Sequence, residues 1–299
     1  MVVSREEAGK KFFLDRYLSL GHRLTGDENT SQAIRVNSLK TTDDEITETL
    51  TALGVELAKV MFLDHGYIVE ESGFSLGASI EYLRGLFSLQ ESASQYAAQT
   101  LAPEAGDTVL DMCAAPGGKT TQIAAYMENR GLLYAVDANI ERVYALENNL
   151  ERCGVENSLV YHGDAIRLEL GTRFSKVLLD APCSGNYVTD PSWFRRRSIE
   201  DVRRNAEFQR ALLSAAVKVL EPGGVLLYAT CSLEPEENEL NVKWLLTNHE
   251  VTLEEIDGPG EKGLTEVFGG RLDAEISKCH RLWPDTTHTQ GFFLAKVVK

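Results

Sequence analysis

Long apolar runs are missing from this sequence of 299 residues. No stretch approaches the roughly 18–20 apolar residues that a membrane-spanning helix needs, so we expect no membrane contact. The N-terminal segment, residues 1–21, is charged and has the pattern of an amphipathic helix rather than of a signal peptide. We therefore predict a cytoplasmic protein. We also expect it to be a monomer.

Cysteine and basic residues are also scarce. Five cysteines, an odd number at irregular spacing, argue against a disulfide framework and favour reduced thiols. The 30 lysines and arginines face 45 acidic residues, which gives a net charge of −15. This balance disfavours a protein that coats nucleic acid nonspecifically, because phosphate binding needs clustered basic side chains. A local basic surface on an acidic body is still compatible with it.

Apolar runs and helical patterns alternate over the second third of the chain. We predict buried strands at residues 107–112, 131–137, 158–164, 176–182 and 225–231. The same pattern predicts helices and one closing strand, namely helices 117–129, 138–154, 198–224 and 234–249 and strand 290–299. Strands that alternate with helices indicate an α/β fold with a mostly parallel, doubly wound sheet.

The first 90 residues follow a different pattern. A strand is predicted at residues 33–40, a helix at 43–54, and two further short strands before residue 91. We predict a small α+β module over residues 1–88, which includes the N-terminal helix, and a larger domain over residues 89–299. The segment 250–290 is rich in glycine, threonine and charged residues and shows no clear pattern.

The stretch VLDMCAAPGGKTTQ, residues 109–122, predicts a strand, a tight turn of small residues and a helix. Glycine in such a turn lets the backbone approach a ligand closely. A phosphate-binding loop is one alternative, because the turn ends in Gly-Lys-Thr. That motif requires glycine where Cys113 stands, and Pro116 removes a backbone donor that would hold a phosphate. The turn also lacks the G-x-G-x-x-G spacing, so the residues argue against a phosphate ligand.

Four predicted strands end at or near an aspartate, namely Asp111, Asp137, Asp164 and Asp180. One such residue is equally well explained as a solvated turn aspartate, but four at one edge of a parallel sheet indicate an acidic crevice. Asp137 is placed to accept hydrogen bonds from ribose hydroxyls, and Asp164 to meet an exocyclic amino group. S-adenosylmethionine combines ribose, adenine and positive charge without phosphate, and is the ligand that this pattern predicts.

Two cysteines follow apolar strand patterns, Cys183 in DAPCSG and Cys231 in YATCSLEPEENE. In open α/β sheets, ligands bind outside the carboxyl ends of the strands. A cysteine thiolate can add to carbon 6 of a pyrimidine, which makes carbon 5 nucleophilic toward the methyl group of a sulfonium ion. Lys119 is a candidate source of the positive potential that favours a thiolate. Asp180 is a candidate proton donor to the ring nitrogen, provided that burial keeps it protonated.

The motifs DMCAAPGGKT, DAPCSG, YATCSLEPEENE and the terminal GFF resemble those of the Nop/Sun (Fmu) family of S-adenosylmethionine-dependent RNA cytosine-5 methyltransferases. The resemblance runs from about Arg35, in RVNSLK, to the C-terminus. It implies a Rossmann-like class I methyltransferase sheet with a small N-terminal α+β RNA-binding module. It also implies that Cys231 is the nucleophile and that Cys183 assists release of the covalent product.

The resemblance further implies a set of cofactor contacts. The family's cofactor loop corresponds to Cys113, Ala114, Ala115, Pro116, Gly117, Gly118 and Lys119. Its ribose and adenine acids correspond to Asp137 and Asp164, the strand-four acid to Asp180, and a further contact to Arg142. The chain departs from the family pattern in the loop after Cys183, which reads SGNYVTDPSWFRRRS. That loop is expected to border the target base and bears on the RNA preference.

Basic side chains gather in that loop and in the helix that follows. They are Arg195, Arg196, Arg197, Arg203 and Arg204, beside Trp193 and Phe194. Arginines next to aromatic rings suit backbone and stacking contacts with unpaired RNA. The alternative is a solvated helix start whose aromatic side chains anchor in the core. We predict RNA, either tRNA or rRNA, as the partner.

Other residues near these motifs have simpler explanations. Cys113 and Cys153 are predicted to pack rather than react, and the single pair Cys279-His280 does not make a zinc site, so no metal is predicted. The segment HTQGFF, residues 288–293, is predicted to lie in the core. Asn238 is a candidate for positioning the loop of the nucleophile. Favourable charge in the first turn of a helix is enough to explain Glu236, Glu237 and Glu239.

The leading hypothesis is an RNA 5-methylcytosine methyltransferase. The compact chain with a short N-terminal module resembles tRNA-modifying members slightly more than rRNA-modifying ones, so tRNA is the expected substrate and rRNA the first alternative. A DNA cytosine-5 methyltransferase would use Cys183 as its nucleophile and usually carries a longer target-recognition region, for which no segment is evident. The third hypothesis is an inactive RNA-binding module, and the intact cysteine pair argues against it.

Overall fold

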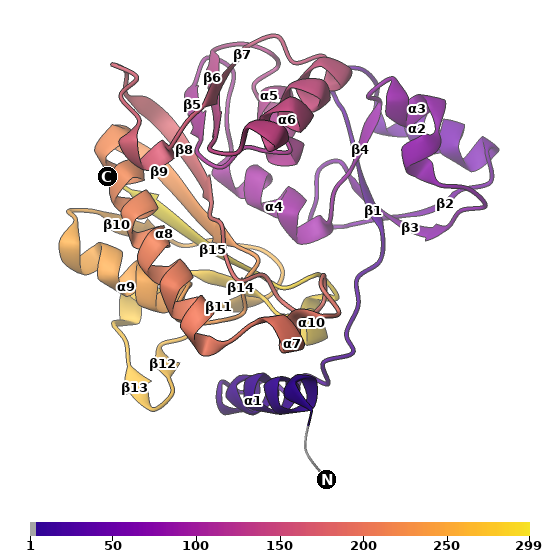
Figure 1. The fold of residues 1–299 in the computed structure, drawn as a ribbon. Helices are drawn as coiled ribbons and strands as arrows, with labels where there is room; N and C mark the ends of the chain where they lie inside the picture. The colour runs from indigo at the N-terminus through magenta and orange to yellow at the C-terminus, as the bar shows by residue number, and fades with distance from the viewer. Residues whose placement is uncertain (1–3) are drawn as a thin grey trace.

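The computed structural model describes residues 4–299. It contains a small antiparallel module, a nine-stranded sheet with helices on both faces, and an N-terminal helix, α1 (Arg5–Ser19) (Figure 1). The predicted α/β fold with a small α+β module is confirmed. None of the helices in the described part of the chain has both the length and the apolar sequence that crossing a membrane requires.

The small module is an antiparallel sheet with the strand order β2-β3-β1-β4. Its core forms where Ile34 and Val36 of the central strand pack with Ile46 and Leu50 of a helix. The strand β2 was not predicted from the sequence, because it is short and has no fully buried residue. The elements are β1 (Ala33–Val36), α2 (Asp43–Ala52), β2 (Glu56–Lys59), β3 (Gly66–Glu71), α3 (Ile80–Leu83) and β4 (Phe87–Leu89).

The large sheet has the strand order β11-β14-β15-β9-β8-β5-β6-β7, and β10 pairs with a second part of β15. Its parallel strands are β5 (Thr108–Asp111), β6 (Leu132–Asp137), β7 (Ser158–His162), β8 (Phe174–Asp180) and β9 (Leu220–Thr230). Its antiparallel strands are β10 (Thr252–Glu254), β11 (Glu261–Lys262), β14 (His280–Leu282) and β15 (Phe292–Val298). The segment 250–290, which showed no pattern, thus supplies much of the antiparallel edge and a separate hairpin, β12 (Glu266–Val267) and β13 (Gly270–Arg271).

Helices cover both faces of this sheet because its buried strands alternate their side chains between two cores. Val177 and Leu179 of β8 lie in the core that contains residues of α8 and α9, whereas Leu178 lies in the core that contains residues of α4 and α5. Helix α8 ends at Val219, earlier than predicted, because β9 already begins at the next residue. The helices are α4 (Ser92–Leu101), α5 (Gly118–Tyr126), α6 (Ile140–Cys153), α7 (Trp193–Arg196), α8 (Ile199–Val219), α9 (Glu239–Asn248) and α10 (Pro284–Thr287).

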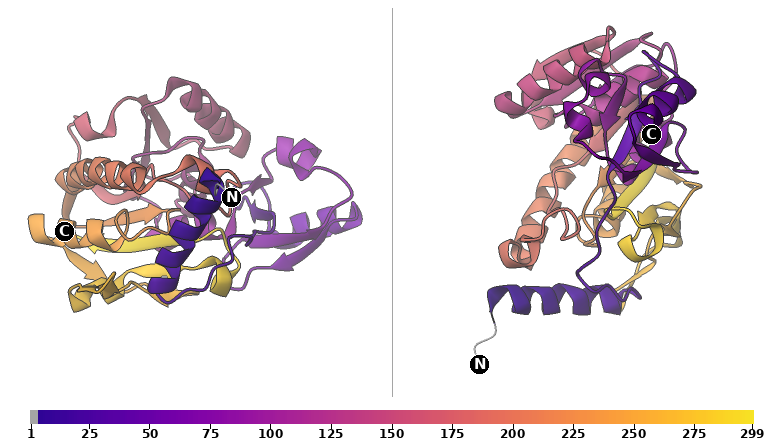
Figure 2. Two further views of the ribbon diagram at one scale, coloured as in Figure 1. Left: turned by 60° about the horizontal axis from the view of Figure 1, so that its bottom comes forward. Right: turned by 90° about the vertical axis from the view of Figure 1, so that its right-hand side faces the viewer.

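The N-terminal helix α1 packs on the large domain, although the predicted boundaries placed it with the small module. Figures 1 and 2 show α1 apart from the module, at the end of the molecule where α7 lies. The ring of Phe13 meets that of Trp193 edge to face, with centroids 4.5 Å apart. Gly9 faces the carbonyl oxygen of Phe194, and an added Cβ would come within 2.1 Å of it. Helix α1 therefore covers the segment that follows Cys183.

The small module contacts the large domain through a buried arginine. Arg35 of β1 is 2% exposed and donates to Gln90 Oε1 and to the Gly118 carbonyl, at 2.6 Å each, and to Thr121 Oγ1 at 2.9 Å. All three partners are uncharged, and burial lowers the pKa of Arg35 to about 10. Because Gly118 belongs to the predicted cofactor turn and begins α5, this contact ties the module to that turn.

Candidate active site

The two motif cysteines meet at the carboxyl ends of neighbouring strands. The Sγ atoms of Cys183 and Cys231 lie 3.2 Å apart. Strands β8 and β9 are parallel neighbours with Asp180 opposite Ala229, so the segments that follow them leave the sheet side by side. The hydrogen bond with Cys231, together with burial, raises the pKa of the Cys183 thiol well above its ordinary value. One thiol is thus held in its protonated form beside the other.

Two asparagines hold the backbone around Cys231. Asn238 Nδ2 donates to the carbonyl of Ser232 at 2.8 Å, and its Oδ1 accepts from the hydroxyl of Thr230 at 2.6 Å. These bonds bracket Cys231 in the way that the sequence suggested for Asn238. Asn186, from the loop after the other cysteine, donates to the carbonyl of Cys231 at 2.7 Å. The sequence analysis did not single out Asn186, because no local pattern links it to that carbonyl.

The glutamates that follow Cys231 are not the solvated helix charges that the sequence suggested. Glu237 is buried, and its carboxylate accepts from the backbone N–H of Ser184 at 2.9 Å. Glu239 is also buried and forms an ion pair of 2.6 Å with Arg281. Only Glu239 lies within helix α9. The prediction is wrong because segments far away in the sequence fold over this turn and bury its carboxylates.

Helix α1 reaches the same turn through a basic side chain. Arg16 lies 2.7 Å from a carboxylate oxygen of Glu234 and 2.7 Å from one of Glu236. Burial raises the pKa of Glu234 to about 7, although the charge of Arg16 opposes that shift. Because Phe13 of the same helix packs on Trp193, α1 spans the segments that follow both cysteines.

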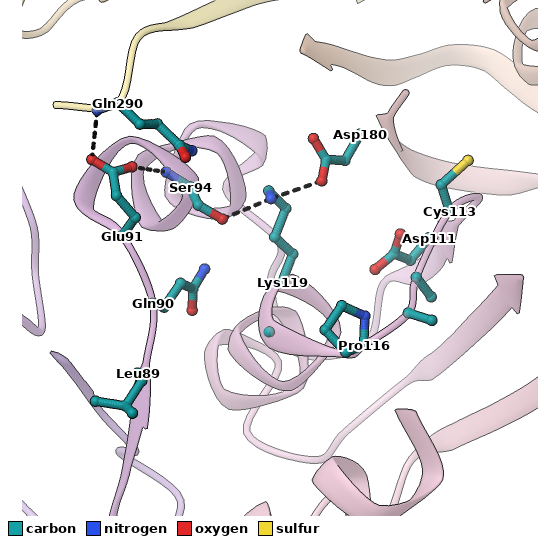
Figure 3. A pocket seen from close by; sticks show the side chains of 13 residues that line it. Leu89, Gln90, Glu91, Ser94, Asp111, Cys113, Pro116, Lys119, Asp180 and Gln290 are labelled. Carbon is teal, nitrogen blue, oxygen red and sulfur yellow. Dashed lines mark hydrogen bonds and ion pairs between the residues drawn. The ribbon is translucent and has the colours of Figure 1, made fainter. Parts of the chain in front are cut away.

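Lys119 of the predicted cofactor turn lies at the edge of the sheet where the two cysteines meet. Lys119 Nζ donates to Asp180 Oδ2 at 2.8 Å and to Ser94 Oγ at 2.7 Å (Figure 3). Burial favours the neutral amine, but the charges of Asp180 and of the Cys231 thiolate outweigh it and raise the pKa of Lys119. The side chain is therefore a buried cation paired with Asp180, and its expected action on the Cys231 thiol remains a prediction.

Burial raises the pKa of a neighbouring acid, Asp111, at this edge of the sheet. The Asp180 side chain is 30% exposed and paired with Lys119, and its expected role as a proton donor remains a prediction. Asp111 is 1% exposed, and burial raises its pKa to about 7. One oxygen of Asp111 accepts from Thr120 at 2.8 Å, and the other has no hydrogen bond within residues 4–299.

Asp111→Asn is expected to change the pH dependence of stability. A carboxyl group whose pKa is higher in the folded than in the unfolded chain costs stability as the pH rises between the two values. The free energy of unfolding of the wild type, relative to the variant, should fall by on the order of 4 kcal/mol from about pH 4 to about pH 7 and then level off. Urea denaturation across this range measures it. A constant difference would contradict the prediction, and Asp44→Asn, at an exposed position, is the control.

A cavity of about 220 Å³ contains the other predicted cofactor residues. Asp137, at the end of β6, accepts from the backbone N–H of Ala115 at 3.2 Å, and Arg142 lies 3.6 Å from the same carboxylate. Asp164 lies at the rim, with its side chain 49% exposed. The apolar lining comes from Met112, Ala138, Ala165, Pro182, Phe208 and Leu212. The sequence analysis did not single out Phe208. The only signal for it was an aromatic residue on the polar side of the predicted helix 198–224.

A second cavity, of about 250 Å³, lies on the other side of the predicted cofactor turn. Cys113 borders both cavities, and burial raises its pKa well above the ordinary value, so its thiol stays protonated. Gly117 caps α5 with φ +102°, where an added Cβ would also approach Leu146 to 2.9 Å. The residues of the turn that line the second cavity are Cys113, Ala114, Ala115, Pro116, Gly118 and Lys119.

The two aromatic residues beside the predicted RNA-contacting arginines do not offer a stacking surface. Trp193 is 1% exposed and Phe194 is 5% exposed. Trp193 Nε1 donates to the carbonyl of Ser184 at 2.8 Å, and its ring packs under α1 against Phe13. The expected stacking on these rings is therefore wrong, and the alternative of aromatic anchors in the core describes them.

The five arginines of this region differ in their surroundings. Arg195 and Arg203 are exposed and form no ion pair within the described residues. Arg197 donates to the carbonyl of Ser184 at 3.1 Å. The other two form pairs with nearby aspartates, Arg196 with Asp190 at 3.3 Å and Arg204 with Asp201.

The remaining residues of the sequence analysis lie in the interior. Cys153 and Cys279 are each 1% exposed, and Phe292 and Phe293 belong to the core, as predicted for the GFF segment. His280 lies within hydrogen-bonding reach of the Pro259 carbonyl. Within residues 4–299, no three histidine, cysteine or acidic side chains gather in an arrangement that would hold a metal ion.

Comparison with known proteins identifies relatives of this chain. A family model described as "16S rRNA methyltransferase RsmB/F" matches residues 98–298. The 28S rRNA (cytosine-C(5))-methyltransferase of Mus musculus is 36% identical over 275 residues, which cover 89% of this chain and 35% of the relative. The tRNA (cytosine(72)-C(5))-methyltransferase of Pyrococcus horikoshii is 39% identical over 226 residues, which cover 75% of this chain and 55% of the relative. The chain thus spans about a third to about half of these relatives.

Two solved structures resemble this chain over almost its whole length. A methyltransferase homolog protein from Pyrococcus horikoshii has a TM-score of 0.85 and 37% identity, over 96% of this chain and 99% of that one. NSun6 from Pyrococcus horikoshii, solved with SFG, has a TM-score of 0.82 and 27% identity, over 98% of this chain and 97% of that one. Because the family model covers well over half of the described fold, the chain belongs to the RsmB/F, or Nop/Sun, family of RNA cytosine-5 methyltransferases.

Proposed function

We propose that this chain is an S-adenosylmethionine-dependent RNA (cytosine-5) methyltransferase that acts on tRNA. The observation that carries the reaction type is the pair of thiols, 3.2 Å apart, beside the Lys119–Asp180 ion pair. A nucleophilic thiol, a second thiol in contact with it and a nearby cation are what addition to a pyrimidine ring and subsequent release require.

The residues of the 220 Å³ cavity fit S-adenosylmethionine. The Asp137 carboxylate ends β6, where ribose hydroxyls are bound in sheets of this kind. The apolar side chains of Phe208 and Leu212 suit the adenine ring, and the acidic surroundings suit a cationic ligand without phosphate. When bound, S-adenosylmethionine supplies an electrophilic methyl group.

The chain's own residues account for the other requirements of the reaction. The Cys231 thiolate adds to carbon 6 of cytosine, and the positive charge of Lys119 favours that thiolate. Asp180 presents a carboxylate, fixed by Lys119, to a base in the 250 Å³ cavity. Release breaks the bond between carbon 6 and the Cys231 sulfur, and the proton at carbon 5 passes to solvent. Cys183 holds a protonated thiol against that sulfur and can protonate it as it leaves. The target base has to leave its stack to reach this site, which costs less in a loop than in a duplex.

The choice of tRNA as substrate rests on a small difference in sequence identity between two relatives. The tRNA methyltransferase of Pyrococcus horikoshii shares 39% identity with this chain, whereas the mouse 28S rRNA enzyme shares 36%. An rRNA substrate is the second candidate, since the ribosomal RNA small subunit methyltransferase F of Cronobacter sakazakii is 36% identical over 90% of this chain and 57% of its own length.

A methyl-transfer assay with separate substrates tests the proposal. Unmodified tRNA transcripts, rRNA fragments and duplex DNA are each incubated with the protein and S-adenosylmethionine, and 5-methylcytosine is measured by nucleoside mass spectrometry. We expect methylation of tRNA at a rate at least about tenfold above that of the rRNA fragments. Methylation of rRNA alone would select the second candidate. Absence of 5-methylcytosine from every RNA would refute the proposed activity.

A further inference from the structure

The 250 Å³ cavity is lined largely by polar side chains, and under the proposed function it receives the target base. It adjoins the nucleophile, since Cys231 follows β9 two residues after Ala229, which lies opposite Asp180. Its polar lining comes from the start of α4, the start of α5, the carboxyl ends of β5 and β8, and the segment just before β15. The side chains are Gln90, Glu91, Ser94, Asp111, Lys119, Asp180 and Gln290.

Most of these side chains already bond to the protein. The ammonium of Lys119 holds both Asp180 and Ser94. The carboxylate of Glu91 accepts from three backbone N–H groups, those of Ala93, Ser94 and Gln290. These contacts are internal to the wall of the cavity and shape it.

The side-chain amide of Gln90 also bonds to the protein. Gln90 Oε1 accepts from Arg35 at 2.6 Å, and its Nε2 donates to Gln122 Oε1 at 3.0 Å. Asp111 accepts from Thr120, and its second oxygen is buried. Neither group therefore offers a free donor together with a free acceptor to a ligand.

Gln290 differs from all of them. Its backbone is fixed at both ends, because its N–H donates to Glu91 at 3.0 Å and its carbonyl accepts from Asn186 Nδ2 at 2.8 Å. The same Asn186 amide donates to the carbonyl of Cys231, so Gln290 and the nucleophile share one anchor. Figure 3 shows the Gln290 side chain running toward the Lys119–Asp180 pair, with no interaction drawn from its carboxamide.

We propose that Gln290 binds the Watson–Crick edge of the target cytosine, an inference that rests on the proposed function. A carboxamide presents an acceptor and a donor side by side. Cytosine presents the matching pair, with the N4 amino group as donor and N3 as acceptor. Glutamine recognises the equivalent amino-and-nitrogen pair of adenine in the same bidentate way. Gln290 is thus a substrate-binding residue that places the pyrimidine ring while Cys231 attacks it.

Glutamate at this position tests the hydrogen-bond pattern, because a carboxylate only accepts. The carboxylate accepts from the N4 amino group of cytosine but faces the N3 acceptor unfavourably. It accepts from the N3–H of uracil but faces the O4 acceptor unfavourably. Gln290→Glu should therefore slow the cytosine reaction without favouring uracil. Gln290→Leu removes both hydrogen bonds at similar size and should weaken the cytosine reaction without favouring uracil. Gln32→Glu makes the same chemical change at an exposed position and is the matched control.

The readout is covalent trapping rather than turnover. Transcripts that contain 5-fluorocytosine or 5-fluorouracil are incubated with S-adenosylmethionine, and stable protein–RNA adducts are counted on denaturing gels, because fluorine at carbon 5 blocks the final elimination. We expect Gln290→Leu to trap 5-fluorocytosine about tenfold or more slowly, since polar groups left unpaired discriminate strongly. We expect Gln290→Glu to slow 5-fluorocytosine trapping by a similar factor, and Gln32→Glu to match the wild type. Gln290→Leu should slow trapping by a transcript that carries pyrimidin-2-one, which lacks the N4 amino group, less than trapping by 5-fluorocytosine, because only one of the two hydrogen bonds is lost there.

Two results separate failure of this inference from failure of the proposed function. If the wild type traps 5-fluorocytosine and both Gln290 variants keep its rate and base ratio, the inference is overturned. It is also overturned if Gln290→Leu slows a transcript that carries pyrimidin-2-one as much as one that carries 5-fluorocytosine, since Gln290 would then only support the loop. A wild type that traps neither base and methylates no RNA would instead refute the proposed function.

Discussion

Cys183→Ala is expected to accumulate a covalent protein–RNA adduct, and Cys231→Ala is expected to form none. The two sulfur atoms are 3.2 Å apart, so each side chain can act on the same carbon–sulfur bond. The raised pKa of Cys183 keeps it a thiol, which can protonate the Cys231 sulfur as that sulfur leaves carbon 6, and the ammonium of Lys119 supplies positive charge at the site. Loss of the nucleophile should lower the methylation rate by roughly 10⁴-fold or more.

Denaturing gels of each variant with RNA and S-adenosylmethionine measure the adduct, and methyl incorporation measures turnover. Cys153→Ala is the control, because Cys153 is buried at the end of α6 and lines neither cavity. It should keep the wild-type rate. An adduct with Cys231→Ala and none with Cys183→Ala would exchange the two roles and favour the chemistry of DNA cytosine-5 methyltransferases.

Arg281→Met is expected to destabilise the protein by about 3–5 kcal/mol, because it leaves a buried carboxylate unpaired. The side chains of Arg281 and Glu239 are 1% and 0% exposed. Arg281 donates to the two oxygens of Glu239 at 2.6 Å each and to the carbonyl of Leu233, two residues after Cys231, at 3.0 Å. The same substitution therefore loosens the turn that holds the nucleophile.

Urea denaturation measures this effect, and the double variant Arg281→Met with Glu239→Met should recover much of the loss, since it leaves no unpaired charge. The exposed ion pair of Lys262 with Glu255 offers a contrast, and Lys262→Met should leave the free energy of unfolding unchanged. A loss below about 1 kcal/mol for Arg281→Met would mean that solvent or another group compensates Glu239.

Local pattern was enough to predict the strands that carry the site. Strands buried on both faces read as apolar runs, and the aspartates and cysteines at their carboxyl ends necessarily gather at one edge of a parallel sheet. This is why Asp111, Asp137, Asp180, Cys183 and Cys231 were identified from the sequence and lie at the same end of the sheet in the structure.

Contacts between distant segments were beyond that reasoning. Arg16 binds Glu234 across 218 positions of sequence, and no local pattern could show that α1 leaves the small module to cover the cysteine loops. The same packing buries Trp193, which the sequence analysis predicted to stack on RNA bases. Gln290 was predicted to lie in the core because its neighbours are apolar, whereas its side chain borders the 250 Å³ cavity.

The sequence by itself determined the fold class, the family and the chemical groups at the strand ends, because each depends on residue type and on spacing within one element. The tertiary structure alone decided which charged groups are buried, since burial depends on the segments that pack over them. That is why burial raises the pKa of Asp111, and why Glu237 and Glu239 support the site from inside.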